Sequence, residues 1–189
     1  MPVDRCKNCG VIKSTPSCTV CKRSIVYEYV ELEEYRGDHF DEYRNEWTDD
    51  HTRNAMTLLK KVNSLIHDIK KVRPDLDFQI TSGWRPAAYN VSIGGALRSR
   101  HIVAQAIDFH DPTGDIAAYL CINKHMLICR GLSIEHPRYT AKSKTSRWVH
   151  IQHPPPRSGR TIFIPYSAAP PLNDEEFTEL ENGEYLIKV

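Results

Sequence analysis

The chain has 189 residues, enough for one catalytic domain and a small appendage. Its 25 Lys and Arg residues nearly balance its 24 Asp and Glu residues, which argues against a membrane or a nucleic acid as the main partner. No apolar run reaches transmembrane length, and residues 1–6 lack the apolar core of a signal peptide. We therefore expect a protein made in the cytoplasm that reaches any target outside the cell by another route.

Two Cys-x-x-Cys pairs open the chain, Cys6 with Cys9 and Cys18 with Cys21. Each pair places two thiolates around a tight turn, and two such pairs can close a tetrahedral zinc site. Two disulfides are the alternative, which a cytoplasmic chain does not favour. We predict a small four-cysteine zinc ribbon over residues 1–24, with a structural zinc that supplies its folding energy, since so short a segment has no core.

The next segment, residues 25–47, is rich in acidic residues, and we expect it to form a strand and a linker. Residues 48–166 read as the main domain, an α+β unit. Thr48 can cap a long helix whose apolar residues recur with helical spacing to Val72. Further along the chain we expect strands at 78–81, 104–109, 132–135, 147–151 and 162–164, a short helical turn at 86–91 and a long helix at 116–129.

The C-terminal tail, residues 167–189, contains Asn182-Gly183 between alternating flanks. This dipeptide is typical of a type I′ hairpin turn. The hairpin either docks on a neighbouring protein or folds back on its own domain, and the pattern does not separate the two.

Three polar residues of the main domain have the right chemistry for a catalytic metal: His101, Asp108 and His150. Two imidazoles and one carboxylate form a three-ligand zinc site that leaves the fourth position to water. Asp108 closes one expected strand and His150 lies in another, while His101 precedes the first of them. If these strands are adjacent, all three side chains meet. The alternative is an accidental trio in a chain with nine histidines.

The surrounding residues resemble a known family. The resemblance rests on Ser82-Gly83-Trp84-Arg85, Asn90, Gly94-Gly95, Ser99-x-His101, Ala106-x-Asp108 and Trp148-Val149-His150. In this order they are similar to the zinc D-alanyl-D-alanine peptidases, which include bacterial carboxypeptidases, phage L-alanyl-D-glutamate endolysins and the zinc fold of hedgehog domains. The resemblance covers residues 50–166. It implies a hedgehog/DD-peptidase-like zinc fold and a peptidoglycan peptide containing D-amino acids as substrate.

Two departures from the family pattern stand out. Ala104 occupies a position where the family usually has Gly, and Arg147 occupies the position where many members have a catalytic Glu. The first change is mild because Ala is small. The second leaves the general base to be assigned, and we predict Glu135, which ends the strand expected beside the His150 strand. His136 is the alternative, and an ordinary surface role for Glu135 also stays open.

The remaining roles follow from the resemblance. Zinc held by the three ligands would lower the pKa of its water far below that of bulk water, to about 7. Arg85 would steady the oxyanion or the substrate carboxylate, since a guanidinium donates two parallel hydrogen bonds. Ser99 and Trp148 would contribute to substrate binding, although an aromatic residue at 148 fits a core position equally well.

We therefore expect a zinc metallopeptidase with one catalytic and one structural zinc. The ribbon and the small size suggest a phage endolysin or a virion-associated wall hydrolase, made in the host cytoplasm and acting after release or in the virion. The ribbon or the C-terminal hairpin would bind virion proteins. One alternative is a structural virion protein that keeps the fold with little activity. Another is an adaptor built around the zinc ribbon.

Overall fold

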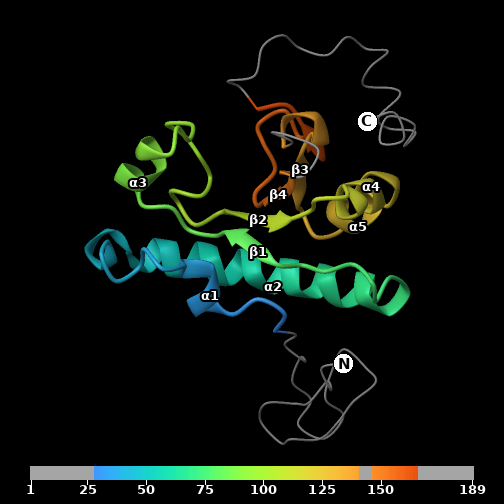
Figure 1. Ribbon diagram of the computed structural model, residues 1–189, viewed down its shortest axis with the longest axis horizontal. Coiled ribbons are helices and arrows are strands. Elements are labelled where there is room, and N and C mark those ends of the chain that lie inside the picture. The colour runs from blue at the N-terminus through green and yellow to red at the C-terminus, as the bar shows by residue number, and fades with distance from the viewer. Residues whose placement is uncertain (1–27, 141–145, 166–189) are drawn as a thin grey trace, which may run out of the picture.

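The computed structural model describes residues 28–140 and 146–165. The predicted zinc ribbon and the predicted C-terminal hairpin lie outside these residues. In the described part, one long helix packs against a five-stranded sheet with strand order β1-β2-β4-β3-β5 (Figure 1). The strands are β1 (Ile80–Ser82), β2 (Ala106–His110), β3 (Ser133–Glu135), β4 (Trp148–Gln152) and β5 (Ile162–Phe163). The α+β class predicted from the sequence is confirmed.

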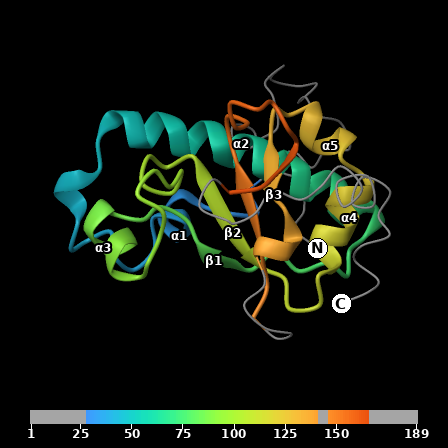
Figure 2. The same cartoon turned by 90° about the horizontal axis from the view of Figure 1, so that it is seen from above.

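The helices surround this sheet. Helix α2 (Asp49–Val72) runs along it, with α3 near the beginning of α2 and with α4 and α5 near its end (Figures 1 and 2). The shorter helices are α1 (Leu32–Arg36), α3 (Ala87–Ser92), α4 (Asp115–Ile122) and α5 (His125–Ile128), with 3-10 turns at η1 (Arg44–Glu46) and η2 (Pro137–Tyr139). None of the helices in the described ranges combines the length and the apolar character that crossing a bilayer requires.

Helix α2 begins where the sequence predicts. The Thr48 hydroxyl accepts the His51 N–H, and the Thr48 N–H donates to Nδ1 of His51, so His51 completes a capping box in place of the usual Glu. Its apolar residues then fall on one buried face that lies in the core: Leu58, Leu59, Val62, Leu65, Ile66 and Ile69.

Side chains alternate along β2 and β4 between the core face of the sheet and the face that carries the candidate metal ligands. Ile107 and Phe109 of β2 join the core that contains the α2 face, as do Val149 and Ile151 of β4. Because successive side chains of a strand point to opposite faces, Asp108 faces away from that core. Strands β2 and β4 are antiparallel, and Asp108 pairs with His150. The second face of the sheet therefore carries the candidate metal ligands.

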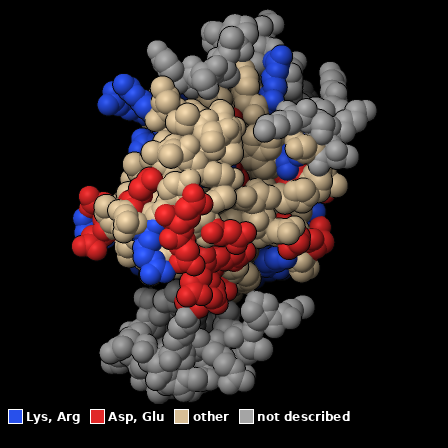
Figure 3. Space-filling model, turned by 60° about the vertical axis from the view of Figure 1, so that its left-hand side comes forward, with Lys and Arg blue, Asp and Glu red and all other residues tan. Residues whose placement is uncertain are grey.

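The described part of the acidic segment before α2 does not form the expected strand and linker. Its described part, residues 28–47, forms α1 and η1, and Tyr35 is fully buried in the core. The Asn63 side chain of α2 accepts the N–H groups of Tyr29 and Val30 and donates to the Val30 carbonyl, which fixes this segment to the helix. The acids point to solvent, and Figure 3 shows acidic side chains gathered on one face of the molecule. Burial of a few aromatic residues therefore outweighs the acidic composition.

The long helix expected over 116–129 is also wrong, because α4 and α5 are separate. The side chain of Asn123 donates to the Tyr119 carbonyl, the same acceptor that its backbone N–H uses. An Asn side chain that bonds the local backbone favours a helix end. The chain turns at Asn123 and Lys124 before α5 starts.

Candidate metal centre

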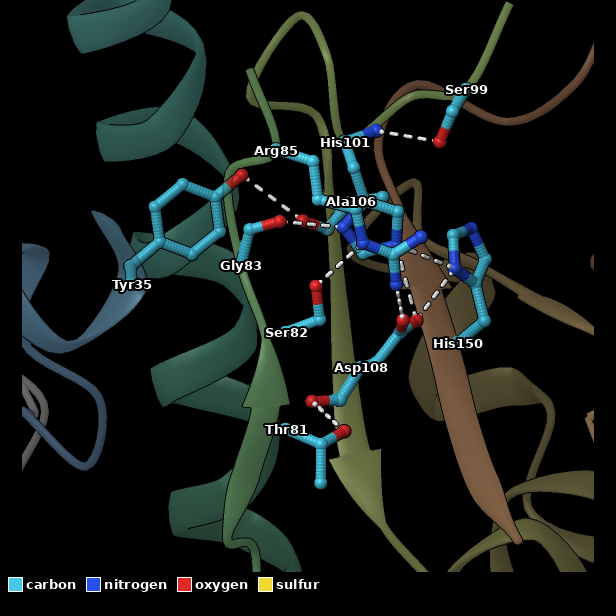
Figure 4. A network of polar contacts seen from close by, with 10 residues as sticks. All are labelled: Tyr35, Thr81, Ser82, Gly83, Arg85, Ser99, His101, Ala106, Asp108 and His150. Atoms are coloured by element: carbon cyan, nitrogen blue, oxygen red, sulfur yellow. Dashed lines mark hydrogen bonds and ion pairs between the residues drawn. The ribbon is translucent and has the colours of Figure 1, made fainter. Parts of the chain in front are cut away.

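The three predicted ligands converge on one point of the sheet (Figure 4). Nδ1 of His150 lies 2.8 Å from Oδ1 of Asp108, and Nε2 of His101 lies 3.2 Å from each of these two atoms. All three residues are buried. Two of them come from paired strands, and His101 reaches in from the loop before β2, as the sequence predicts.

The protonation of His101 follows from its other nitrogen. Nδ1 lies 2.6 Å from the carbonyl oxygen of Gly83, and a carbonyl only accepts, so Nδ1 carries the hydrogen. Burial lowers the pKa of His101 and so favours the neutral ring, although the charge of Asp108 opposes this effect. Nε2 then presents a lone pair to the centre of the cluster. A backbone carbonyl behind a ligating His is the usual way to fix its tautomer and orientation.

This donor set fits a zinc ion. A lone pair on His101 Nε2 and a carboxylate oxygen of Asp108 repel each other at 3.2 Å unless a cation lies between them. Tetrahedral ligands at the usual zinc distances are separated by about 3.3 Å, close to the observed spacing. Imidazole and carboxylate are also the ligands of catalytic zinc sites. The three residues can therefore hold one zinc and leave a position open.

Asp108 is held in place by several contacts. Its Oδ2 accepts from Nη2 of Arg85, and Nε of Arg85 donates to the Ser82 hydroxyl at 2.7 Å. Burial alone would raise the pKa of Asp108, but the neighbouring His101 and His150 rings outweigh burial and hold that pKa well below its usual range. Asp108 is thus an anion in the folded protein, and Arg85 fixes its second oxygen.

Glu135 lies beside the cluster. Ile134 of β3 pairs with Ile151 of β4, so the same register continued by one residue puts Glu135 opposite His150. Ser82, Asp108, His150 and Glu135 thus form one row across four strands on the same face. Burial raises the pKa of Glu135 to about 7, with the Asp108 charge adding to the rise and His150 opposing it.

The loop that carries His101 is anchored by the first turns of α2. Nε2 of His51 donates to the Ile102 carbonyl at 2.9 Å, and the Asn54 side chain donates to the Val103 carbonyl at 2.9 Å. The indole N–H of Trp84 also donates to Ile102 at 3.2 Å. Ala104 ends the loop with a φ of 55°, the left-handed region that glycine adopts at no steric cost. The glycine that the resemblance implies at this position would adopt this conformation without strain.

The other predicted residues lie around the cluster in different ways. Ser99 accepts the backbone N–H of His101 at 3.3 Å, so its hydroxyl shapes the ligand loop. Trp148 shares the His150 face of β4, is partly buried and pairs with His110. The alternative base, His136, is fully buried, and its Nδ1 accepts the Arg138 N–H. Arg147 lies by the turn before α4, since a Cβ added to Gly114 would meet its Nη1 at 3.2 Å.

Sequence reasoning missed four residues that support the site. Tyr35, His51 and Asn54 lie in segments without any ligand, and no local pattern connects them with it. Gly83 belongs to the quoted motif, but its role as the acceptor for His101 depends on a contact across 18 residues.

The fold and the donor set fit the class of enzymes with one catalytic zinc. Residues 39–152 match the family model of peptidase M15, and the match includes all three ligands, Arg85 and Glu135. It spans more than half of the chain, which therefore belongs to the peptidase M15 family of zinc D-Ala-D-Ala carboxypeptidases. Membership implies a zinc metallopeptidase. A comparison with curated proteins gives no match.

Proposed function

We propose that this protein is a zinc peptidase that hydrolyses peptidoglycan peptides containing D-amino acids. The observation that supports this most directly is the meeting of His101, Asp108 and His150 on one face of the sheet, with Glu135 next in the same row. Family membership supports the class of substrate. A role as a phage endolysin or a virion-associated wall hydrolase is the finer part of the proposal and rests on the sequence.

In this proposal His101, Asp108 and His150 hold the zinc, which when bound supplies a Lewis acid that acidifies water and polarises a carbonyl. Glu135 acts as general base. It takes a proton from the attacking water and delivers it to the nitrogen of the leaving amine as the C–N bond breaks. A carboxyl group whose pKa lies near 7 suits both transfers at neutral pH. Glu135 replaces the family Glu at position 147.

Arg85 contributes in two ways. Its bond to Oδ2 of Asp108 keeps that carboxylate turned toward the two imidazoles. The guanidinium side chain remains 18% exposed, so it can also donate to an oxyanion or a substrate carboxylate. Ser99 and Trp148 are proposed to line the substrate site, Ser99 through the loop that it shapes and Trp148 through its place two residues before His150 on the same strand face.

The structural zinc at Cys6, Cys9, Cys18 and Cys21 remains part of the proposal, with the ribbon and the C-terminal hairpin as contacts for virion proteins. The ribbon carries five basic residues and one acidic residue, Asp4, over residues 1–24. Basic charge would suit an acidic partner surface.

The test uses purified, zinc-loaded protein incubated with peptidoglycan, with new amino groups as the readout. The wild type should release them, and His101→Ala should not. His125→Ala is the matched control, because His125 is an exposed histidine on α5 outside the cluster. If the folded, zinc-loaded wild type releases no amino groups from peptidoglycan, the protein is a structural relative with little activity.

A further inference from the structure

Tyr35 connects a segment outside the family match to the metal centre. It belongs to α1, which ends before residue 39, where the matched residues begin. The side chain is fully buried and ranks among the largest buried side chains of the core. Tyr35 is thus a deeply buried side chain that lies outside the residues matched by the family model.

Two hydrogen bonds of Tyr35 reach β2 and the segment that follows β1, and Figure 4 shows the first of them. Its hydroxyl donates to the Ala106 carbonyl at 3.0 Å, two residues before Asp108 on β2. Its own carbonyl accepts the Trp84 N–H at 2.9 Å, directly after Gly83. Burial raises the pKa of Tyr35, so the hydroxyl stays protonated and remains a donor.

The contact at Gly83 is close. A Cβ added to Gly83 would lie 1.9 Å from the Tyr35 carbonyl oxygen, so only glycine permits this approach. The Gly83 carbonyl in turn accepts the Nδ1 hydrogen of His101. The backbone of Tyr35 is therefore in direct contact with Gly83, the residue whose carbonyl orients His101.

The Tyr35 segment is itself fixed. The three bonds between Asn63 and residues 29–30 hold the chain just before α1 to helix α2. The segment before Tyr35 is thus anchored to the long helix, and Tyr35 itself bonds β2 and the segment that follows β1. A rigid support of this kind is what metal ligands need for a defined geometry.

We propose that Tyr35 is a positioning residue for the metal: through Gly83 and Ala106 it sets the relative placement of His101 and Asp108, and so the affinity and coordination geometry of the site. This inference rests on the proposed zinc site. It assigns to the N-terminal segment a role in metal binding beyond filling the core.

The test compares Tyr35→Phe with wild type in the full chain, using Co²⁺ as a spectroscopic probe and a chelator competition for affinity. Each spectrum is corrected by subtracting that of the same protein carrying His101→Ala, which removes any contribution from the Cys-rich segment. Tyr35→Phe should bind the metal about tenfold more weakly, at the lower end of the effect of residues that orient ligands. The Co²⁺ d–d bands should also change in intensity or position.

Tyr29→Phe is the matched control. The Tyr29 hydroxyl bonds Nδ1 of His67 at 3.1 Å, so the variant loses a partly buried hydroxyl bond of the same kind, away from the strands of the site. The variant keeps the backbone bonds of Tyr29 and Val30 to Asn63, so metal affinity and spectrum should stay unchanged. If Tyr35→Phe does not fold, Gly83→Ala tests the second contact of Tyr35, that of its backbone carbonyl, and an equal or larger loss of metal affinity is expected.

The outcomes separate this inference from the proposed function. If wild type and its His101→Ala variant give identical Co²⁺ spectra, the metal site itself is wrong. If the wild type binds the metal and Tyr35→Phe shows the same affinity and the same spectrum, the role of Tyr35 is overturned but the metal site is not. Equal losses in Tyr35→Phe and Tyr29→Phe would also overturn it, because the effect would then be one of general stability.

Discussion

Asp108 and His150 are direct cross-strand partners on β2 and β4, and their Oδ1 and Nδ1 atoms lie 2.8 Å apart. Two of the three candidate ligands are therefore placed by the backbone register of a sheet. Only His101 depends on a loop, and that loop is anchored to α2 at Ile102 and Val103. Sites on rigid elements hold their geometry better than sites on free loops.

Glu135→Gln tests the general base. The amide keeps the shape of the side chain but cannot take a proton, so kcat should fall by about 10²- to 10⁴-fold, while the zinc content stays that of wild type. Glu34→Gln, at an exposed position of α1, should behave as wild type. Unchanged kcat in Glu135→Gln would move the base to another residue.

The same residue predicts how stability depends on pH in metal-free protein. Burial raises the pKa of folded Glu135 from 4.5 to about 7, so between these values the folded state binds more protons than the unfolded state. The free energy of unfolding should therefore fall as pH rises through this window, by up to about 3 kcal/mol at 1.36 kcal/mol per pKa unit.

Urea unfolding at pH 5 and pH 8, with a chelator present, measures this change. The free energy of unfolding should differ less between pH 5 and pH 8 in Glu135→Gln than in wild type, because the variant has no carboxyl group at this position to titrate. Identical pH dependence in the two proteins would show that Glu135 titrates normally.

Arg85→Lys tests the support of Asp108. A lysine ammonium cannot bond Asp108 and Ser82 through one planar fork, so Asp108 should lose its fixed orientation. We expect zinc affinity or kcat to fall about 10- to 100-fold, the usual effect of removing a partner of a ligand.

Arg73→Lys provides the matched control for Arg85→Lys. Arg73 likewise pairs with a carboxylate, but on the surface: its Nε and Nη2 both donate to Asp75. This variant should change neither zinc affinity nor kcat. If Arg85→Lys is equally silent, the ion pair with Asp108 has no part in the site.

Ala104 predicts a contrast between two substitutions. Its φ of 55° suits glycine, and the side chain is fully buried. Ala104→Gly removes the backbone strain but also a buried methyl group, so stability should change by less than about 1 kcal/mol. Ala104→Val places a β-branched residue in the left-handed region of a closed site and should cost more than about 2 kcal/mol. Urea unfolding measures both, and similar stability of the two variants would contradict this account of the loop.

The sequence predicts those parts of the site that depend on strand periodicity. Alternation in the segments around Asp108 and His150 places both side chains on one face, and the short loop before β2 brings His101 to them. The sequence also predicts the strand that ends at Glu135 at nearly its observed position. Each of these inferences needs only a local pattern and the assumption that the strands are neighbours.

Contacts between distant segments could not be predicted. Tyr35 lies in an acidic stretch that reads as a linker, and its burial depends on a fit against Gly83 that no local pattern encodes. Helix α4 ends where the side chain of Asn123 bonds the Tyr119 carbonyl, whereas sequence periodicity alone favours continuation of the helix. In both cases packing or a single side-chain bond outweighs composition and pattern.

The zinc content per chain of wild type, His101→Ala and His150→Ala, with His125→Ala as control, tests the central claim most directly. The account predicts that each of the first two variants holds one zinc fewer than wild type, while His125→Ala keeps the wild-type number. Folded His101→Ala and His150→Ala proteins with the same zinc content as wild type would contradict it.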